Sequence, residues 1–289
     1  MIRYVWRVDL SVGTPVFFSR ASKFNFLLLL TVKRILTIAH NTFRESVRDR
    51  VLYNVLAFVC LLIGGGLFFS QSSLGQEARV ITDIGLSAMR LFGVAIAILI
   101  GVSLVSKEIE RRTIAVLLSK PVERYEFIVG KYGGLCLTLL VNVFVMAAAL
   151  TLALWYAQGG ADAQQARIWA ASYLIWLELC VLTAWALLFS SFSTPFLAAL
   201  LTLLLFVLGN WHADLRALAE GAPAWATRVA ARGLTYVVPN LPNFNFIAET
   251  ARGLPLSGKL VLGVTGYAVL YGAALLAVTA LIFQRRNFK

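Results

Sequence analysis

Long apolar stretches without charged side chains recur along this chain and limit what it can fold into. Four blocks contain at most one charged residue each: Val51–Phe69, Ile84–Ser106, Tyr132–Ala161 and Leu260–Gln284. A fifth block, between Arg167 and Asp214, contains only Glu178. An apolar stretch of about 18 residues or more can cross the hydrocarbon core of a bilayer as a helix. With 60% hydrophobic and 14% charged residues, the chain is predicted to lie in a membrane.

Six membrane-spanning helices are predicted, because Ser190–Pro195 divides the fifth block into two. Their expected positions are residues 51–70, 85–106, 132–157, 169–190, 195–210 and 260–284. The predicted fold class is therefore all-α, a polytopic membrane protein with six transmembrane helices. The expected domains are a cytoplasmic N-terminal segment, residues 1–50, and a six-span domain, residues 51–289.

Positive charge is distributed unequally between the two sides of these predicted spans. Residues 1–50 contain nine Lys and Arg, residues 107–131 contain six, and the tail after Gln284 contains three. The other side receives eight, five of them in the long connection 211–259. Cytoplasmic segments of membrane proteins carry an excess of Lys and Arg. Both termini and residues 107–131 are thus predicted to be cytoplasmic. Attraction to anionic lipid explains the net positive charge of the chain, so no nucleic-acid partner is expected.

An amphipathic helix is predicted just before the first span. From Val32 to Arg50, apolar residues recur at helical spacing, and Arg44 and Arg48 lie one turn apart on the polar side. This pattern is typical of a helix that lies on the inner membrane surface. Two roles fit it equally well: a simple interfacial anchor, or a surface on which a partner docks.

The connection 107–131 has more structure than a simple loop requires. It contains ten charged residues, and Glu108 and Arg112 are spaced for an ion pair on one helix face. Pro121 suits the first turn of a second helix. Three apolar residues add an edge to this surface: Ile114, Leu117 and Leu118. We expect a helical elbow on the cytoplasmic side that binds a partner.

Two motif regions carry a resemblance to a known family. They are "HNTFRESVRDRVLY" with the span after it and "KEIERRTIAVLLSKPVERYEFIVGKYGG"; "YVVPNLPNFNF" before the last span adds to them. The order and spacing over residues 33–289 resemble the type-2 ABC exporter permeases, above all the branch that serves maturation of multicopper enzymes such as nitrous-oxide reductase. The leader 1–32 departs from the family pattern.

This resemblance implies a separate ATPase subunit, which would contact the N-terminal helix and the elbow. By this resemblance, eight residues of the elbow lie in or near the ATPase contact. They are Glu108, Glu110, Arg111, Arg112, Thr113, Pro121, Arg124 and Lys131. With the apolar edge and Arg44 and Arg48 of the N-terminal helix, they form the predicted ATPase-coupling surface. The resemblance also implies a pair of permease copies with a pair of ATPases, and short helices in 211–259 that cap the outer mouth.

Motifs for catalysis are absent from the sequence. The chain has no G-x-x-x-x-G-K-[ST] loop, H-E-x-x-H or G-x-S-x-G, so we expect no catalytic residue, and ATP and Mg²⁺ are expected on the partner. Three methionines and three dispersed cysteines make a poor set of ligands for copper. No metal or cofactor is predicted for this chain.

Glu178 is the acidic residue that lies deepest in a predicted span. Carboxylates within membranes often serve a function, and three roles stay open here: a proton or cation site, a substrate contact, or a structural hydrogen bond. Arg90, at the outer end of its predicted span, is expected to extend toward the membrane surface.

Together these features predict the permease subunit of an ATP-driven ABC exporter in a cell membrane, with a bacterial inner membrane as the expected location. The alternative is a membrane anchor that transports nothing, or a transmitter that passes ATPase motion to a periplasmic partner, for example in metalloenzyme maturation.

Overall fold

The computed structural model describes residues 20–46, 57–60, 77–110, 124–158 and 163–221, and then most of 228–285. Helices account for the regular structure in these residues, and no strand occurs among them. The long helices are α1 (Arg20–Ser46), α3 (Glu77–Glu110), α5 (Arg124–Gln158), α6 (Ala163–Ser190), α7 (Pro195–Asn210) and α11 (Gly258–Arg285). Three shorter helices are α8 (His212–Gly221), η2 (Leu241–Phe244) and α10 (Ile247–Ala251). The all-α prediction is confirmed for the described chain.

Four of the predicted spans correspond to helices that are long and apolar enough to cross a membrane. Their apolar parts are Ala78–Val102, Tyr125–Tyr156, Gln165–Ser190 and Gly258–Ile282. α7 matches the predicted fifth span, but it has only 16 residues. The first predicted span lies outside the described residues except for a helical piece at 57–60. The chain is thus a multi-pass membrane protein, while the count of six stays a prediction.

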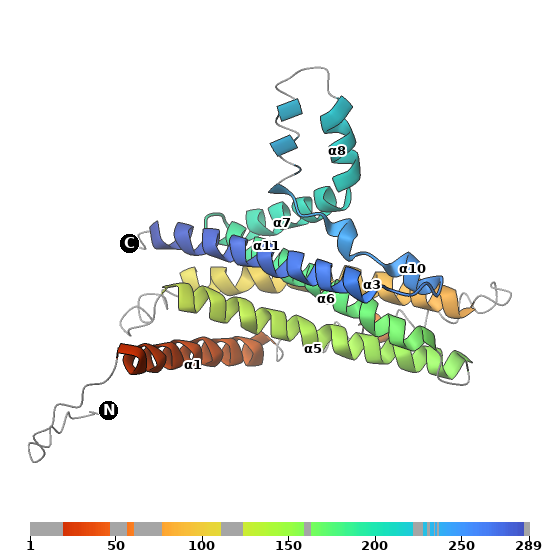
Figure 1. Ribbon diagram of the computed structural model, residues 1–289, viewed down its shortest axis with the longest axis horizontal. Coiled ribbons are helices and arrows are strands. Elements are labelled where there is room, and N and C mark those ends of the chain that lie inside the picture. The colour runs from red at the N-terminus through yellow and green to blue at the C-terminus, as the bar shows by residue number, and fades with distance from the viewer. Residues whose placement is uncertain are drawn as a thin grey trace, which may run out of the picture.

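α6 lies inside the bundle, and α11 runs in front of it in the view of Figure 1. In the apolar part of α6, 83% of the residues are buried, against 17% in α11. A helix that is apolar all round and still exposed has no stable place in water. The exposed apolar surface of α11 is therefore the surface expected to face lipid or another chain.

Small residues allow the long helices to approach closely. A Cβ atom on Gly93 of α3 would lie 2.6 Å from Leu179, and one on Gly101 would lie 2.8 Å from Ala186. Both contacts advance along α3 and α6 in the same direction, so these two helices are parallel. Small residues at contacts of this kind are characteristic of packing between membrane helices.

α1 packs along the beginning of α5 in the same direction. Gly130 faces Ile38, and Gly134 faces Thr42 and the carbonyl oxygen of Ala39. The helix predicted from Val32 is present and begins earlier, at Arg20. One face of the described helix is covered by α5 rather than by lipid, which refines the prediction of an interfacial helix. Its position relative to a membrane surface stays a prediction.

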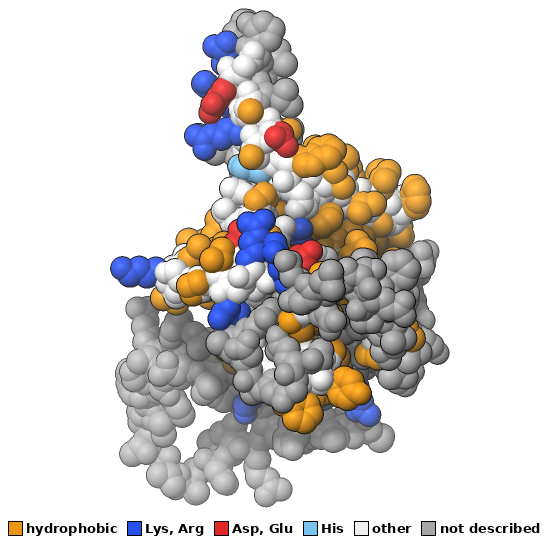
Figure 2. Space-filling model, turned by 90° about the vertical axis from the view of Figure 1, so that its right-hand side faces the viewer, with side chains coloured by type: hydrophobic (Ala, Val, Ile, Leu, Met, Phe, Trp, Pro, Cys, Tyr) orange, Lys and Arg blue, Asp and Glu red, His pale blue; other side chains and the backbone are white. Residues whose placement is uncertain are grey.

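The start of α1 and the end of α11 lie toward the same end of the bundle, together with the end of α3 and the start of α5 (Figure 1). α8 projects from the side of the bundle beyond α7. Figure 2 shows the molecule from the end of the bundle opposite the start of α5. Charged side chains gather on α8 and near its base, whereas hydrophobic side chains cover one flank. This arrangement agrees with termini that share one side of the membrane. Which side is cytoplasmic stays a prediction.

Candidate functional site

Arg90 of α3 and Glu178 of α6 form a buried ion pair inside the bundle. Arg90 Nε donates a hydrogen bond to Glu178 Oε2 at 2.8 Å, and Nη2 donates to Oε1 at 2.5 Å. The Glu178 side chain is fully buried, and that of Arg90 is 13% exposed. Two parallel bonds between guanidinium and carboxylate are the strongest geometry for such a pair. Each residue lies near the middle of its apolar helix, so the pair lies among the spans.

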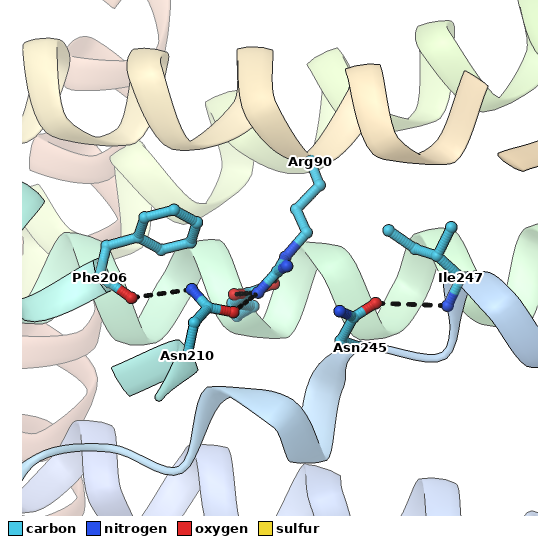
Figure 3. A network of polar contacts seen from close by, with 6 residues as sticks. Arg90, Phe206, Asn210, Asn245 and Ile247 are labelled. Atoms are coloured by element: carbon cyan, nitrogen blue, oxygen red, sulfur yellow. Dashed lines mark hydrogen bonds and ion pairs between the residues drawn. The ribbon is translucent and has the colours of Figure 1, made fainter. Parts of the chain in front are cut away.

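α7 completes the surroundings of the Arg90 guanidinium. Nη2 also donates to Asn210 Oδ1 at 2.7 Å, and the guanidinium carbon lies 5.3 Å from the ring centre of Phe206 (Figure 3). Asn210 Nδ2 donates in turn to the carbonyl oxygen of Phe206 at 2.8 Å, which orients the amide. Arg90 therefore joins three helices, α3, α6 and α7, through one side chain.

The prediction that Arg90 extends toward the membrane surface is wrong. Its side chain turns inward because Glu178 lies on the neighbouring parallel helix at almost the same level. A charge among apolar helices is costly unless an opposite charge and hydrogen bonds compensate it. For Glu178, this geometry supports the structural alternative, and a role in contact with substrate stays a prediction.

A pocket of about 360 Å³ lies beside the ion pair. Small-molecule sites in proteins usually have volumes of about 300–1,000 Å³. The lining comes from α3, α7, α10 and the residues just before α10: Asp83, Ser87, Arg90, Leu91, Phe206, Asn245, Ile247 and Ala248. Charged, polar and apolar side chains thus meet in one cavity of suitable size for a ligand.

Residues 237–248 form one wall of this pocket, and α11 and α7 hold them in place. Tyr271 donates a hydrogen bond to the carbonyl oxygen of Val237 at 2.5 Å, and Tyr267 accepts one from the backbone N–H of Asn240 at 3.1 Å. Leu241 is fully buried and packs against Gly209, where a Cβ would lie 2.8 Å from it. From Val237 on, the motif "YVVPNLPNFNF" therefore folds back against the spans.

A glycine turn attaches the far end of this segment to α6. Gly253 has φ of 77°, a conformation that other residues rarely adopt. Its carbonyl oxygen accepts a hydrogen bond from Arg167 near the start of α6, and α10 packs on α3 and α6. The expected outer connection is thus folded onto the bundle over residues 237–256. Its predicted capping role at an outer mouth is not tested by these contacts.

Most of the predicted ATPase-coupling residues lie outside the described part of the chain. These are Arg48, Arg111, Arg112, Thr113, Ile114, Leu117, Leu118 and Pro121. Glu108 and Glu110 belong to the last turns of α3, and Arg124 begins α5, whereas Arg44 is exposed on α1. The coupling surface and the elbow stay predictions.

Two charged residues near the start of α5 are buried. Glu126 is 1% exposed and lies 3.7 Å from the Arg34 guanidinium of α1. Lys131 is 5% exposed, with its ammonium 5.2 Å from the ring centre of Phe127. Lys131 is therefore not freely available to a partner, although the resemblance placed it in or near an ATPase contact.

Residues 36–217 match the family described as "ABC-2 family transporter protein". The match covers more than half of the 289 residues. The chain belongs to the ABC-2 transporter family. Comparison with curated proteins gives no match. The family-matched range includes α3, α5, α6 and α7, and with them Arg90, Glu178 and Asn210. The resemblance to type-2 ABC permeases is thus confirmed at family level, and the branch that serves copper enzymes is not supported by the match.

Sequence reasoning missed most of the residues that form the site of this ABC-2 protein. Glu178 was identified because an acidic residue in an apolar stretch is conspicuous. Asn210 and Asn245 resemble ordinary turn residues at the ends of helices. Asp83 lies just before the span predicted to begin at residue 85, whereas α3 begins at Glu77. The available signal was Val80 and Ile81, which lie one helical turn before Ile84, the first residue of the apolar block.

Proposed function

We propose that this chain is the membrane-spanning permease subunit of an ATP-driven ABC exporter, and that a separate subunit hydrolyses ATP. Membership in the ABC-2 transporter family carries this proposal. The sequence contains no P-loop motif, so ATP and Mg²⁺ would bind to the partner, where a glycine-rich loop holds the phosphates. The working assembly would contain two permease copies, identical or different, and two ATPases in a bacterial inner membrane.

The packing of α1 on α5 supports the proposed route of coupling. α1, the end of α3 and the start of α5 lie toward one end of the bundle, where the predicted coupling residues of both regions would meet. A partner that displaces α1 would act on α5 directly, because Gly130 and Gly134 leave no space between the two helices. Packed interfaces of this kind transmit displacement rather than absorb it.

The alternative is an anchor or a transmitter of ATPase motion to a periplasmic partner. A membrane anchor needs no cavity, and large apolar side chains can fill the space between its helices. The pocket beside Arg90, with Asp83 and Asn245 in its lining, favours a permease that handles a ligand. A transmitter would couple to the ATPase in the same way but would move no ligand across the membrane.

The proposal is tested by co-expression with the ABC ATPase that we expect to be encoded next to this gene, followed by co-purification and ATPase measurement. Ile114→Pro, in the predicted elbow, should abolish co-purification or uncouple ATP hydrolysis from transport. Ala217→Pro breaks α8, an exposed helix that projects from the side of the bundle away from the predicted coupling region (Figure 1), and should leave ATPase binding unchanged.

Two results would overturn this function. One is ATP hydrolysis by the isolated chain. The other is normal ATPase binding and coupling after residues 111–123 are replaced by a flexible glycine-serine linker. ATPase binding and coupled turnover without movement of any ligand would instead identify the transmitter.

A further inference from the structure

One face of α3 presents opposite charges to the pocket at its two ends. Asp83, Ser87 and Arg90 all line it, and their spacing of four and three residues places them on the same helix face. With a rise of about 1.5 Å per residue, the backbones of Asp83 and Arg90 are about 10 Å apart along the helix. Any ligand that fills the cavity meets a carboxylate at one end and a guanidinium at the other.

The Arg90 end retains hydrogen-bond donors for a ligand. A guanidinium has five N–H donors, and Nε and Nη2 are bound by Glu178 and Asn210. For Nη1, no acceptor occurs in the part of the chain that the structure describes. Asn245 uses its side-chain oxygen to accept from the Ile247 N–H at 3.4 Å, which leaves the amide N–H₂ on the side toward Arg90 (Figure 3). This end of the pocket suits an oxygen acceptor such as a phosphate.

At the other end of the pocket, the Asp83 carboxylate can accept a hydrogen bond from a ligand. Asp83 is exposed, and none of the described residues forms an ion pair or hydrogen bond with its carboxylate. Because Glu178 already compensates the charge of Arg90, the Asp83 carboxylate leaves the lining with a net negative charge. A purely anionic ligand would be repelled, whereas an ammonium group would be attracted.

The apolar part of the lining continues onto a surface suited to hydrocarbon. Leu91 lines the pocket and is 65% exposed. On α7, beside Phe206, three more apolar side chains are exposed: Leu203, Leu204 and Val207. An acyl chain that leaves the pocket would lie on this surface, which a small soluble zwitterion would not use.

We propose that the pocket between α3, α7 and α10 binds the zwitterionic headgroup of an amphiphile, with its phosphate at Arg90 and Asn245 and its primary ammonium at Asp83. An ethanolamine phospholipid has this chemistry. A choline headgroup has no N–H to donate to Asp83, and a glycerol headgroup has no cation. The expected order of affinity is ethanolamine, then choline, then glycerol.

The test is a titration of the purified full-length chain in detergent with short-chain phosphatidylethanolamine, phosphatidylcholine and phosphatidylglycerol, with binding measured by native mass spectrometry. The wild type should bind the ethanolamine lipid at least about tenfold more tightly than the glycerol lipid, as a charge-assisted hydrogen bond allows. Asp83→Asn should remove this preference. Asp214→Asn removes an exposed carboxylate on α8 and should keep it.

Equal affinity of the wild type for the three lipids would overturn the proposal, as would an unchanged preference in Asp83→Asn. Because Asp83 is exposed, Asp83→Asn should melt at the wild-type temperature, so loss of preference would not reflect unfolding. The measurement requires no ATPase, and its outcome is therefore separate from that of the proposed export function.

A second arm distinguishes the two sources of such a headgroup, a resident membrane lipid and a transported amphiphile. The chain and its ATPase are reconstituted in vesicles that contain headgroup-labelled phosphatidylethanolamine. ATP-dependent movement of the label to the opposite leaflet, lost in Asp83→Asn, identifies cargo. Binding without movement identifies a resident lipid. Movement that persists in Asp83→Asn counts against this site.

Discussion

Separating Arg90 from Glu178 tests whether their ion pair stabilises the bundle. Arg90→Met leaves a fully buried carboxylate, and Glu178→Leu leaves a guanidinium that is only 13% exposed. Breaking a buried ion pair by removal of one partner costs about 3–5 kcal/mol, whereas replacement of both partners by apolar residues is often neutral. The double variant Arg90→Met/Glu178→Leu should therefore be more stable than either single variant.

The expected change in melting temperature follows from the size of the chain. An unfolding entropy of about 2.1 cal/mol/K per residue gives about 0.6 kcal/mol/K for 289 residues. A loss of 3–5 kcal/mol then lowers the melting temperature by about 5–8 °C. The assay is thermal unfolding of the purified full-length chain in detergent, followed by circular dichroism.

The two single variants should respond differently to pH. A lone buried carboxyl can neutralise itself by binding a proton, whereas a guanidinium stays charged at every accessible pH. In Arg90→Met, folding is accompanied by proton uptake, so its stability relative to the double variant should rise as the pH falls. Glu178→Leu should show no such recovery.

Two outcomes would refute this reasoning. Single variants that melt within about 1 °C of the wild type would show that breaking the ion pair lowers the free energy of unfolding by much less than the expected 3–5 kcal/mol. A double variant as unstable as the worse single variant would show that packing at these positions, rather than charge compensation, determines stability.

Three further predictions concern packing and topology. Gly134→Ala places a Cβ 2.5 Å from the Ala39 carbonyl oxygen and should release α1 from α5, measured as faster proteolysis of α1. Gly133→Ala, whose nearest contact is 3.8 Å, is the control, and equal proteolysis of both variants would contradict the packing argument. Gly253→Ala should lower stability by about 1–2 kcal/mol because of its positive φ, and an unchanged melting temperature would count against this. A cysteine at Lys120 should resist impermeant labelling from outside intact cells, and labelling there would reverse the predicted topology.

Much of the architecture was predictable because membrane insertion depends on properties of short segments. The four long helices lie where apolar blocks with at most one charged residue predicted them, since a helix in lipid must satisfy its own backbone and present apolar side chains. Their limits were less predictable. α3 begins at Glu77, several residues before the predicted span. α10 packs on α3, and a contact between distant segments cannot be read from the hydropathy of either one.

The site itself depended on tertiary structure. From the sequence, Glu178 was conspicuous and Arg90 was expected to turn outward, because hydropathy describes each helix alone. The pair forms because Gly93 allows α3 to approach α6 closely and because the two helices run in parallel. Asn210 and Asn245 join it only when α7 ends beside Arg90 and the segment before α10 folds back onto the bundle.

The sequence by itself thus determined that this chain is helical, lies in a membrane and belongs with ABC-type permeases, because composition and motif order are local properties. Only the tertiary structure decided that Arg90 turns inward, that α1 is attached to α5 and that Asp83 and Arg90 share a cavity. Those features depend on which helix faces are neighbours, and residues such as Arg90 and Glu178, 88 positions apart, become neighbours only through packing.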